Sequence, residues 1–433
     1  MLGDFICRLL RNRRGNVAAI FALSLLPIVF LTGMAMDFTA ASQKKAQLNA
    51  AADAAALVAV TPAMMNQSAA NAQTAAQNIF KAEASGMNGL LYTNPTVTVT
   101  QSGLTRTVAV SYTANSVNSF PSILGTTTWS FSGSSTATAT TSPSIDFYLL
   151  LDNSPSMNIA ATSAGINLMV ANTSAQGGCA FACHETNPAA DNLGNPNGED
   201  NYTLAANLGV VTRVQNMAAA TSQLMSTAAA TEANSNSSYR MAIYTFAQSG
   251  TQTIQSLTSN LTAAGTAAAG INVLEVCSNN YLTCGSNNND TDTNFESAMS
   301  SINSTMPTPG TGTSGSTPQE VLLMVTDGVD DEISGTCSQS LDGNRCQQPF
   351  NTTWCTTVKN RGIRIAVLYT EYLPLPTNAW YNQWIAPFQS QIGPNLQSCA
   401  SPGLYFQVTT DGDISAAMQA LFQQAINSAR LTQ

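Results

Sequence analysis

The sequence predicts an α/β domain with a doubly wound, mostly parallel sheet, preceded by a transmembrane helix and a small antiparallel β module. Three observations predict this order. Residues 17–35 carry no charge, and residues 90–142 alternate β-branched with polar residues. From Ile145 onward, hydrophobic strands alternate with amphipathic helices. A chain of 433 residues has room for more than one such domain.

The charge distribution narrows the possible functions. Only 9% of the residues are charged, and the formal net charge is −9. Residues 1–14 carry four Arg and one Asp, so that the rest of the chain carries a charge of −12. An acidic body disfavours nucleic acid as the main partner. The chain has one imidazole, His184, which disfavours enzymes that need several, and we expect a protein without catalytic activity.

Residues 17–35 predict a transmembrane helix. Nineteen residues of α-helix span about 29 Å, which is enough to cross the hydrocarbon core of a bilayer. The basic segment 1–16 predicts a cytoplasmic N-terminus and an exported body. A cleaved signal peptide is the alternative, because Gly33-Met34-Ala35 resembles a small-x-small cleavage site.

The next two segments differ in composition. Residues 36–86 are rich in Ala and predict a helical extension, with one helix ending near Pro62 and a second over about 66–85. Residues 87–143 predict the small β module, because their apolar residues recur at every second position. The alternating residues mark four short strands: Val97 and Val99, Val108 and Val110, Trp129 and Phe131, and Ala137 and Ala139.

The main domain is predicted over residues 144–433. It begins with a buried strand, Ile145–Leu151, followed by a long Asn- and Gly-rich insertion over about 158–205. The later elements predicted from the pattern are a helix over about 206–230, strands over 241–246, 321–325, 363–369 and 404–408, and a closing helix over about 413–430.

Side chains with oxygen donors lie next to three segments of the main domain. Asp152, Ser154 and Ser156 come at alternate positions directly after the first strand. Thr291 precedes a short helix, and Asp327 follows the strand 321–325. Ligands of open α/β sheets lie at the carboxyl ends of the strands, and hydroxyl and carboxylate oxygens suit Mg²⁺. The simpler alternative is that these residues only cap a turn or a helix.

The pattern Asp152-x-Ser154-x-Ser156, Thr291-Asp-Thr and Thr-Asp327-Gly resembles the von Willebrand factor A domain. The resemblance implies a Rossmann-like sheet and a metal-ion-dependent adhesion site. Ser154 and Ser156 would coordinate Mg²⁺, or another divalent cation such as Mn²⁺, directly. Thr291 would coordinate it directly or through water, and Asp152 and Asp327 would hold coordinating waters. An Asp or Glu carboxylate of a partner protein would complete the shell.

A phosphatase of the haloacid dehalogenase type is a weaker alternative for the same loop. Such an enzyme also starts with an Asp after a strand. It needs a second Asp two residues later, where this chain has Ser154.

The N-terminal region carries a second resemblance. The stretch RRGNVAAIFALSLLPIVFLTGMAMDF resembles the TadE/TadG-like N-terminus of tight-adherence (Flp) pilus assembly proteins, and the whole chain is similar to TadG-type proteins. Gly15 corresponds to the prepilin processing site of related pseudopilins, which carry Glu where this chain has Ile20. The resemblance implies a single-pass inner-membrane protein whose periplasmic body binds other pilus-assembly components. A purely structural pilus-base component with a stabilising metal, or a metal-dependent hydrolase, are the alternatives.

The cysteines fit an exported protein. Cys7 lies before the membrane segment, and the other eight lie after it, an even number that suits a disulfide framework. We expect the local pairs Cys179–Cys183 and Cys277–Cys284, while the pairing of Cys337, Cys346, Cys355 and Cys399 stays open. In the stretch CAFACH, which ends at His184, a haem attachment or a metal site is the alternative to a disulfide.

Overall fold

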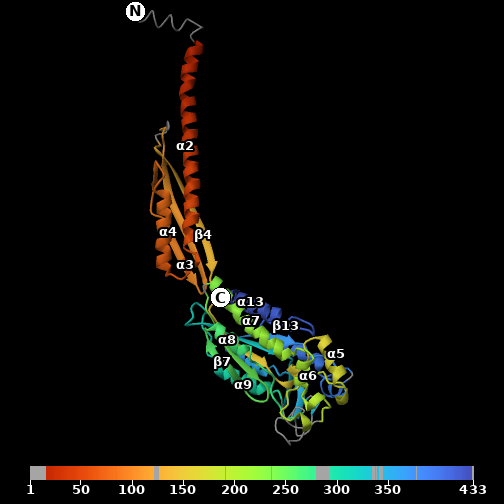
Figure 1. Cartoon of the computed structure of the whole chain (residues 1–433). Coiled ribbons are helices and arrows are strands. Elements are labelled where there is room, and N and C mark those ends of the chain that lie inside the picture. The colour runs from red at the N-terminus through yellow and green to blue at the C-terminus, as the bar shows by residue number, and fades with distance from the viewer. Residues whose placement is uncertain are drawn as a thin grey trace, which may run out of the picture. The chain divides into compact units, whose positions relative to one another are not determined.

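The computed structural model separates the chain into two compact units, residues 1–141 and 142–433, which are described one at a time (Figure 1). The N-terminal basic segment, Thr291 and Cys284 lie outside the described residues. The described residues are 16–120, 126–190, 192–235, 237–278, 292–333, 337, 339–340, 345–376 and 378–431.

The first unit is built on one long helix, α2 (Asn16–Val58), which is 43 residues long and contains Pro27 (Figure 1). Its first half is apolar on all sides and exposed: Val17, Phe21 and Leu23 are 64–74% exposed. A helix that is apolar all round requires an apolar environment. Within the described residues, α2 is the one helix long and apolar enough to cross a membrane, which confirms the predicted apolar helix.

The second half of α2 packs on an antiparallel sheet. The long strand β3 (Thr105–Val117) pairs with β1 (Leu90–Tyr92), β2 (Thr96–Ser102) and β4 (Thr128–Thr140). Two further helices follow α2: α3 (Pro62–Met65) and α4 (Ala69–Ala84), the latter capped by Ser68. Small Ala side chains let both long helices approach the sheet closely, around Leu48, Phe80 and Val108.

The predicted pair of strands around Trp129 and Ala137 is one strand, β4. The residues at the centre of β4 are small and mostly polar because α2 lies close to the strand. A Cβ atom at Gly133 would lie 2.6 Å from the Tyr112 hydroxyl and would also meet Asn49 of α2. The strand therefore requires Gly where the pattern predicted a break.

The second unit contains a mixed sheet of six strands in the order β13-β12-β8-β5-β6-β7. All adjacent pairs are parallel except β6 and β7, which are antiparallel. The α/β class with a mostly parallel sheet is thereby confirmed. The bounds of the strands are β5 (Ile145–Asp152), β6 (Tyr239–Phe246), β7 (Gln252–Thr258), β8 (Gln319–Thr326), β12 (Arg364–Thr370) and β13 (Tyr405–Val408).

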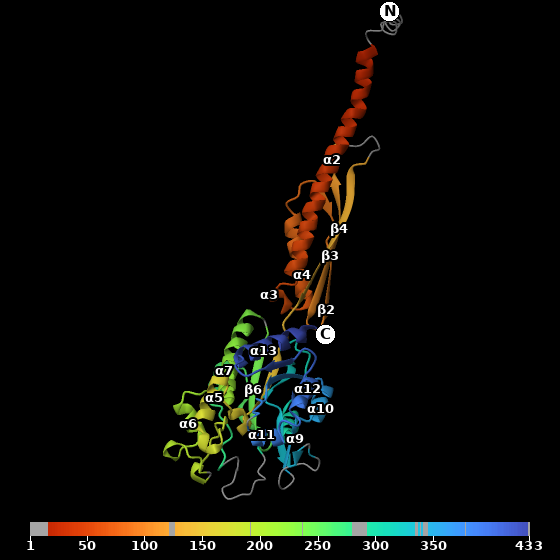
Figure 2. The ribbon, with the colours of Figure 1, turned by 90° about the vertical axis from the view of Figure 1, so that its right-hand side faces the viewer.

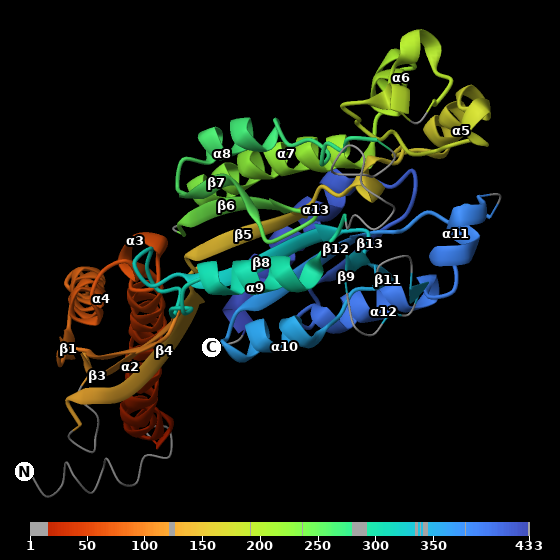
Figure 3. The same ribbon diagram turned by 90° about the horizontal axis from the view of Figure 1, so that it is seen from below.

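Helices cover both faces of this sheet (Figure 3). One face of β5, with Phe147 and Leu149, packs against α7 (Arg213–Asn234), α8 (Leu261–Ala268) and α13 (Ile414–Leu431). The other face, with Tyr148 and Leu150, packs against α9 (Phe295–Thr305), α10 (Thr353–Asn360) and α12 (Gln389–Cys399). Figure 2 shows α13 beside α7 on the first face. Because both faces are covered, β5 is a continuous buried run, as predicted.

The predicted helix over 206–230 is wrong in its first part. The chain forms a short helix, α6 (Asn201–Asn207), then turns, and α7 begins only at Arg213. Thr212 and Gln215 form a capping box that fixes this start. The structure also contains elements that the sequence pattern did not predict: α5 (Ser163–Asn172), α11 (Ala379–Trp384), and a sheet of β9 (Val329–Ile333), β10 (Gln339–Ser340) and β11 (Arg345–Pro349).

The disulfides confirm part of the framework. Cys337 pairs with Cys346, and Cys355 pairs with Cys399, which settles the pairing that the sequence left open. Cys277 is also disulfide-bonded.

The predicted Cys179–Cys183 disulfide is wrong, because the structure holds both residues as thiols. Backbone contacts hold this segment instead: Phe181 bridges Ile159, and Ala182 N donates to Asn158 O.

Candidate metal centre

The sheet order reverses between β5 and β8. From β5 the chain moves toward β6 and β7 on one side, and β8, β12 and β13 follow on the other side. Crevices that bind ligands form at such a reversal, outside the carboxyl ends of the strands. Asp152 ends β5 and Thr326 ends β8, so both side chains lie at this edge.

The Asp152 carboxylate organises the loop after β5. It is fully buried, and its Oδ1 accepts hydrogen bonds from Ser154 N at 3.0 Å and Ser154 Oγ at 2.6 Å. Its Oδ2 accepts a bond of 2.6 Å from Thr326 Oγ1 across the strands. The hydroxyls of Ser154 and Ser156 lie 3.0 Å apart. Asp152, Ser154 and Ser156 are thus gathered at one point, as the sequence predicted.

Asp327 belongs to the same group. It is fully buried, and its Oδ1 accepts a weak bond of 3.3 Å from Val329 N. Its Oδ2 is buried and accepts no hydrogen bond of ordinary geometry within the described parts of the chain, although the Ser156 hydroxyl is near enough to favour the charged form of this carboxylate. A buried carboxylate oxygen without a partner costs free energy, so this oxygen is available to a cation.

The turn at Asp327 depends on Gly328. Its φ is +76°, and a Cβ atom there would lie 2.5 Å from Ile392 Cγ2 of α12. Any other residue would push the loop away from α12, so Gly328 holds Asp327 at the edge of the sheet.

The two carboxylates repel each other and are poorly solvated. Burial, and then the charge of Asp327, raises the pKa of Asp152 to about 7, against the hydrogen bonds from Ser154 and Thr326. Burial raises the pKa of Asp327 as well, although Ser156 and the guanidinium of Arg213 favour its charged form. Two buried carboxylates near one weak countercharge make this edge attractive to a cation.

The donor set fits a hard cation. It consists of two carboxylates and two hydroxyls, all oxygen, which is what Mg²⁺ and Mn²⁺ prefer. Within the described residues no group of three or more His, Cys, Asp or Glu side chains is placed to hold a metal. A site here would therefore depend on Ser154 and Ser156. The role of Thr291 stays a prediction.

A cavity of about 310 Å³ opens beside Ser156. Its charged residues are Arg345, Asp331 and Asp292, and Arg345 donates to Asp331 at 2.7 and 2.5 Å. Burial raises the pKa of Asp331, while Arg345 lowers it. Thr293, Tyr372 and Trp380 also line this cavity. The cavity gives the edge of the sheet a recess large enough for a side chain of another protein.

Sequence reasoning missed three residues of this region. Thr326 was read only as part of a turn motif, yet it donates to Asp152. The guanidinium of Arg213, buried at the start of α7, lowers the pKa of Asp327 by its positive charge. Arg345 comes from β11. A Thr at the end of a strand is a usable signal, but nothing in the local sequence marks either Arg.

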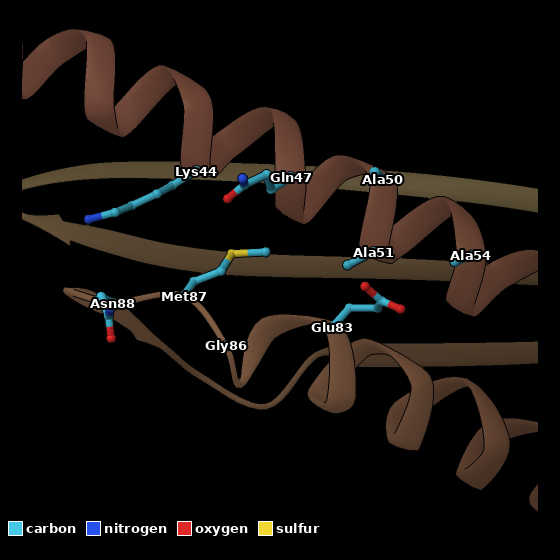
Figure 4. Close-up of a pocket in the computed structure, with 9 residues that line it drawn as sticks. All are labelled: Lys44, Gln47, Ala50, Ala51, Ala54, Glu83, Gly86, Met87 and Asn88. Carbon is cyan, nitrogen blue, oxygen red and sulfur yellow. The ribbon is translucent and has the colours of Figure 1, made fainter.

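A second cavity, of about 630 Å³, lies in the first unit between α2, α4 and the segment after α4 (Figure 4). Lys44 comes from α2, and Glu83 comes from α4 (Figure 4). Lys44 Nζ donates to Gly89 O and Ser116 Oγ, both at 3.0 Å, and therefore fastens the helix to the sheet. This cavity has neither a buried unpaired polar atom nor a cluster of like charges on the residues that line it.

Helix α2, which lines this cavity, lies in a part of the chain that matches the model of a known family. Residues 15–73 match the family model described as putative Flp pilus-assembly TadE/G-like. The match covers the apolar half of α2, its Ala-rich half and the start of α4. It supports the predicted pilus-assembly segment at the N-terminus.

Similar solved structures include two proteins of pili. The pilus adhesin SpaC from Lactobacillus rhamnosus GG is 11% identical, with a TM-score of 0.35, over 79% of this chain and 34% of its own. This chain thus spans about a third of the length of that adhesin. The PilB minor pilin from Streptococcus sanguinis is 12% identical, with a TM-score of 0.33, over 78% of this chain and 79% of its own. No curated protein matches the chain.

Proposed function

We propose that this chain is a membrane-anchored component of tight-adherence pilus assembly, with its body in the periplasm. The match of residues 15–73 to the TadE/G-like family supports the pilus role. The exposed apolar half of α2 supports the anchor, and the Arg residues before it support a cytoplasmic N-terminus.

The first unit contains features suited to a membrane interface. Phe120, 43% exposed, lies against α2, because a Cβ atom at Gly33 would be 2.9 Å from it. Phe38, 58% exposed, meets Trp129 edge to face at 5.7 Å. Aromatic side chains are enriched where a transmembrane helix leaves the hydrocarbon core. We place the end of the membrane segment near residues 33–38, in agreement with the span expected over 17–35.

We infer that the second unit is a von Willebrand factor A domain that binds partner proteins at a metal-ion-dependent adhesion site. The observation that carries this inference is the unpartnered Oδ2 of Asp327 beside Asp152, Ser154 and Ser156, at the reversal of the sheet order. The sheet order and the covered faces also suit the domain. We include Thr291 in the proposed ligand set because the resemblance to the von Willebrand factor A domain implies it.

The residues of the chain have distinct parts in this proposal. Ser154 and Ser156 present their hydroxyls, and Asp152 orients Ser154 through two hydrogen bonds. Thr326 locks Asp152 to β8. A Mg²⁺ or Mn²⁺ ion, when bound, supplies an open position for an Asp or Glu carboxylate of the partner. The cavity beside Ser156 offers room for that side chain.

We propose binding, and not catalysis, as the role of this edge. General acid–base chemistry most often uses an imidazole. The one imidazole of the chain, His184, is engaged with Asp200 at 2.8 Å. A turnover assay against phosphoesters is the direct check, and we expect no activity.

Metal-dependent crosslinking in membranes tests the proposed binding. We expect the wild type to crosslink to a partner in Mg²⁺, and to lose that crosslink in a chelator. Asp152→Asn and Asp327→Asn should lose it in either condition, because the Asn side chain keeps the shape but removes the charge. Asp53→Asn, at an exposed position of α2, is the matched control and should behave as the wild type.

Two results would contradict the proposal. A crosslink that survives both the chelator and the two substitutions shows a partner bound elsewhere on the chain. A crosslink that survives while chelation lowers only the unfolding temperature supports the structural alternative, in which the ion stabilises loops.

A further inference from the structure

The inserted loop after β5 holds the one His of the chain, and the proposed adhesion site does not use it. His184 has a side chain that is 33% exposed. Its ring stacks on Tyr202, with the centroids 4.8 Å apart and an interplanar angle of 26°. The ring therefore has a fixed plane and remains accessible to solvent.

Asp200 fixes the orientation of this imidazole. Its Oδ2 lies 2.8 Å from His184 Nδ1 and also accepts a bond of 2.9 Å from Glu185 N. Its Oδ1 accepts a bond of 2.7 Å from Thr203 N at the start of α6. A carboxylate on one ring nitrogen is the arrangement that holds metal-binding His residues in proteins, because it makes the other nitrogen the acceptor.

The other nitrogen faces a second carboxylate. His184 Nε2 lies 4.0 Å from Glu275 Oε1, and the Glu275 side chain is 53% exposed. A zinc ion with ordinary bond lengths holds two such ligand atoms about 3.3 Å apart. A shift of less than about 1 Å by the exposed Glu275 side chain reaches that distance, because its rotatable bonds are free to adjust.

Backbone hydrogen bonds hold the two ligand segments together. Val276 N donates to His184 O at 3.0 Å, and Thr186 N donates to Val276 O at 2.9 Å. Glu275 is therefore held beside His184 by the main chain, whatever its side chain does. Leu274 N also donates to Asn153 O at 2.7 Å, which ties the same segment to the loop after β5.

We propose that His184 Nε2 and the Glu275 carboxylate bind a divalent transition-metal ion, with Zn²⁺ the best fit. Imidazole favours Zn²⁺ over Mg²⁺, so this site differs in chemistry from the all-oxygen group at Asp152. Two protein ligands leave the remaining positions to water. The ion joins the inserted loop to the segment 274–277, and through Leu274 it steadies the loop that begins at Asp152.

Titration calorimetry with Zn²⁺ alone, on the full chain stripped of metal, tests this proposal. We expect one ion bound with an affinity in the micromolar range. His184→Ala should weaken binding by roughly tenfold or more, and Glu275→Gln by a smaller factor, because each removes one ligand. Asp53→Asn and Glu199→Gln are the controls. Neither should change the zinc affinity, because the first lies at an exposed position of α2 and the second at a partly exposed position of the insertion, away from His184 Nε2 and the Glu275 carboxylate.

The thiols of Cys179 and Cys183 are a rival zinc site, and the experiment separates them. We expect the double variant Cys179→Ser/Cys183→Ser to keep the zinc affinity, and X-ray absorption to show nitrogen and oxygen neighbours without sulfur. Zinc affinity that is equal in the wild type, His184→Ala and Glu275→Gln would overturn the proposal. A sulfur shell, or zinc lost only in the double variant, would also overturn it. Circular dichroism confirms that each variant is folded.

Discussion

Two sets of buried charged side chains, one in each unit, are arranged in opposite ways. In the first unit, Arg106 is 3% exposed and donates to Met64 O, Gln67 O and Gln101 Oε1. Asp37, 5% exposed, accepts from Ser119 N and Phe120 N. Each of these charged groups is matched by partners from the same unit.

In the second unit, Asp152 and Asp327 are buried together, and one oxygen of Asp327 has no partner within the described residues. The first arrangement is compatible with a stable fold, because hydrogen bonds offset the cost of burying each charge. The second is unfavourable by itself, and in the proposed function a bound cation offsets that cost. Buried charge alone therefore does not mark a candidate site. Asp152 and Asp327 stand out because two buried carboxylates lie together at the reversal of the sheet order, and one of their oxygens has no hydrogen-bond partner within the described residues.

Removal of Arg106 should give the largest effect on stability. Arg106→Met removes the hydrogen bonds that this buried guanidinium donates to Met64 O, Gln67 O and Gln101 Oε1, and we expect the free energy of unfolding of the first unit to fall by about 2–4 kcal/mol. Hydrogen exchange measured along the full chain in lipid nanodiscs checks this. Exchange should rise in β3 and β4 but not in β5 and β8. Lys45→Met, at an exposed position of α2, is the control, and an equal rise in both units would contradict the comparison.

Asp327→Asn tests the second half of the comparison. Without a metal, the variant should be more stable than the wild type by about 1–2 kcal/mol, because one of two repelling carboxylates is neutral. Saturating Mg²⁺ should raise the stability of the wild type by about 2–3 kcal/mol and leave the variant unchanged. Chemical denaturation with and without Mg²⁺ measures both. If Mg²⁺ does not stabilise the wild type, the comparison is contradicted, and Asp327 is a structural charge like Arg106 and Asp37.

Glu320 offers a test by pH at the opposite end of β8. It lies beside Asp146 in the register of β5 and β8, and Asp146 pairs with Arg240 at 2.5 Å. Burial, and then Asp146, raises the pKa of Glu320 to about 8 from an ordinary value of 4.5. The folded state therefore keeps a proton that the unfolded state loses, and the stability of the wild type falls as the pH rises from 4.5 to 8.

Glu320→Gln should reduce that slope, with the remainder due to other raised carboxyls such as Asp152, and should stabilise the second unit by about 1–3 kcal/mol at pH 8 relative to the wild type. Thermal unfolding at several pH values is the measurement. Glu199→Gln, at a partly exposed position, should keep the slope. If the stability of Glu320→Gln falls with pH as steeply as that of the wild type, groups other than Glu320 cause the pH dependence.

Ser68→Ala is expected to have the smallest effect. Ser68 Oγ accepts from Asn71 N and caps α4, so its loss should cost about 1 kcal/mol. Hydrogen exchange should rise in α4 alone. A matching rise in α7 would mean that the two units unfold together.

The sequence predicted that the donors after β5 and β8 lie together, and for a physical reason. Parallel strands end at the same edge, so donors that follow β5 and β8 must meet if the two strands are neighbours. Asp152, Ser154 and Asp327 meet in this way. Arg213 and Arg345 escaped prediction because their approach depends on how α7 and β11 pack, and no local pattern records that packing.

Regular elements were predicted where burial imposes a period. The apolar runs of β5 and β8 and the alternation of β3 are examples. Strand β7 escaped because it lies at the edge of the sheet and is only half-buried, so that its residues need not be apolar. Strand β4 was divided in two because Gly133 accommodates α2, which is a tertiary requirement.

Mg²⁺ binding to the full chain, followed by titration calorimetry, tests the central proposal most directly. We expect the wild type and Asp53→Asn to bind one ion with the same affinity, and Asp327→Asn to lose at least about tenfold in affinity. Equal affinity in all three proteins, or no binding in the wild type, would contradict the assignment of Asp152, Ser154, Ser156 and Asp327 as a metal site.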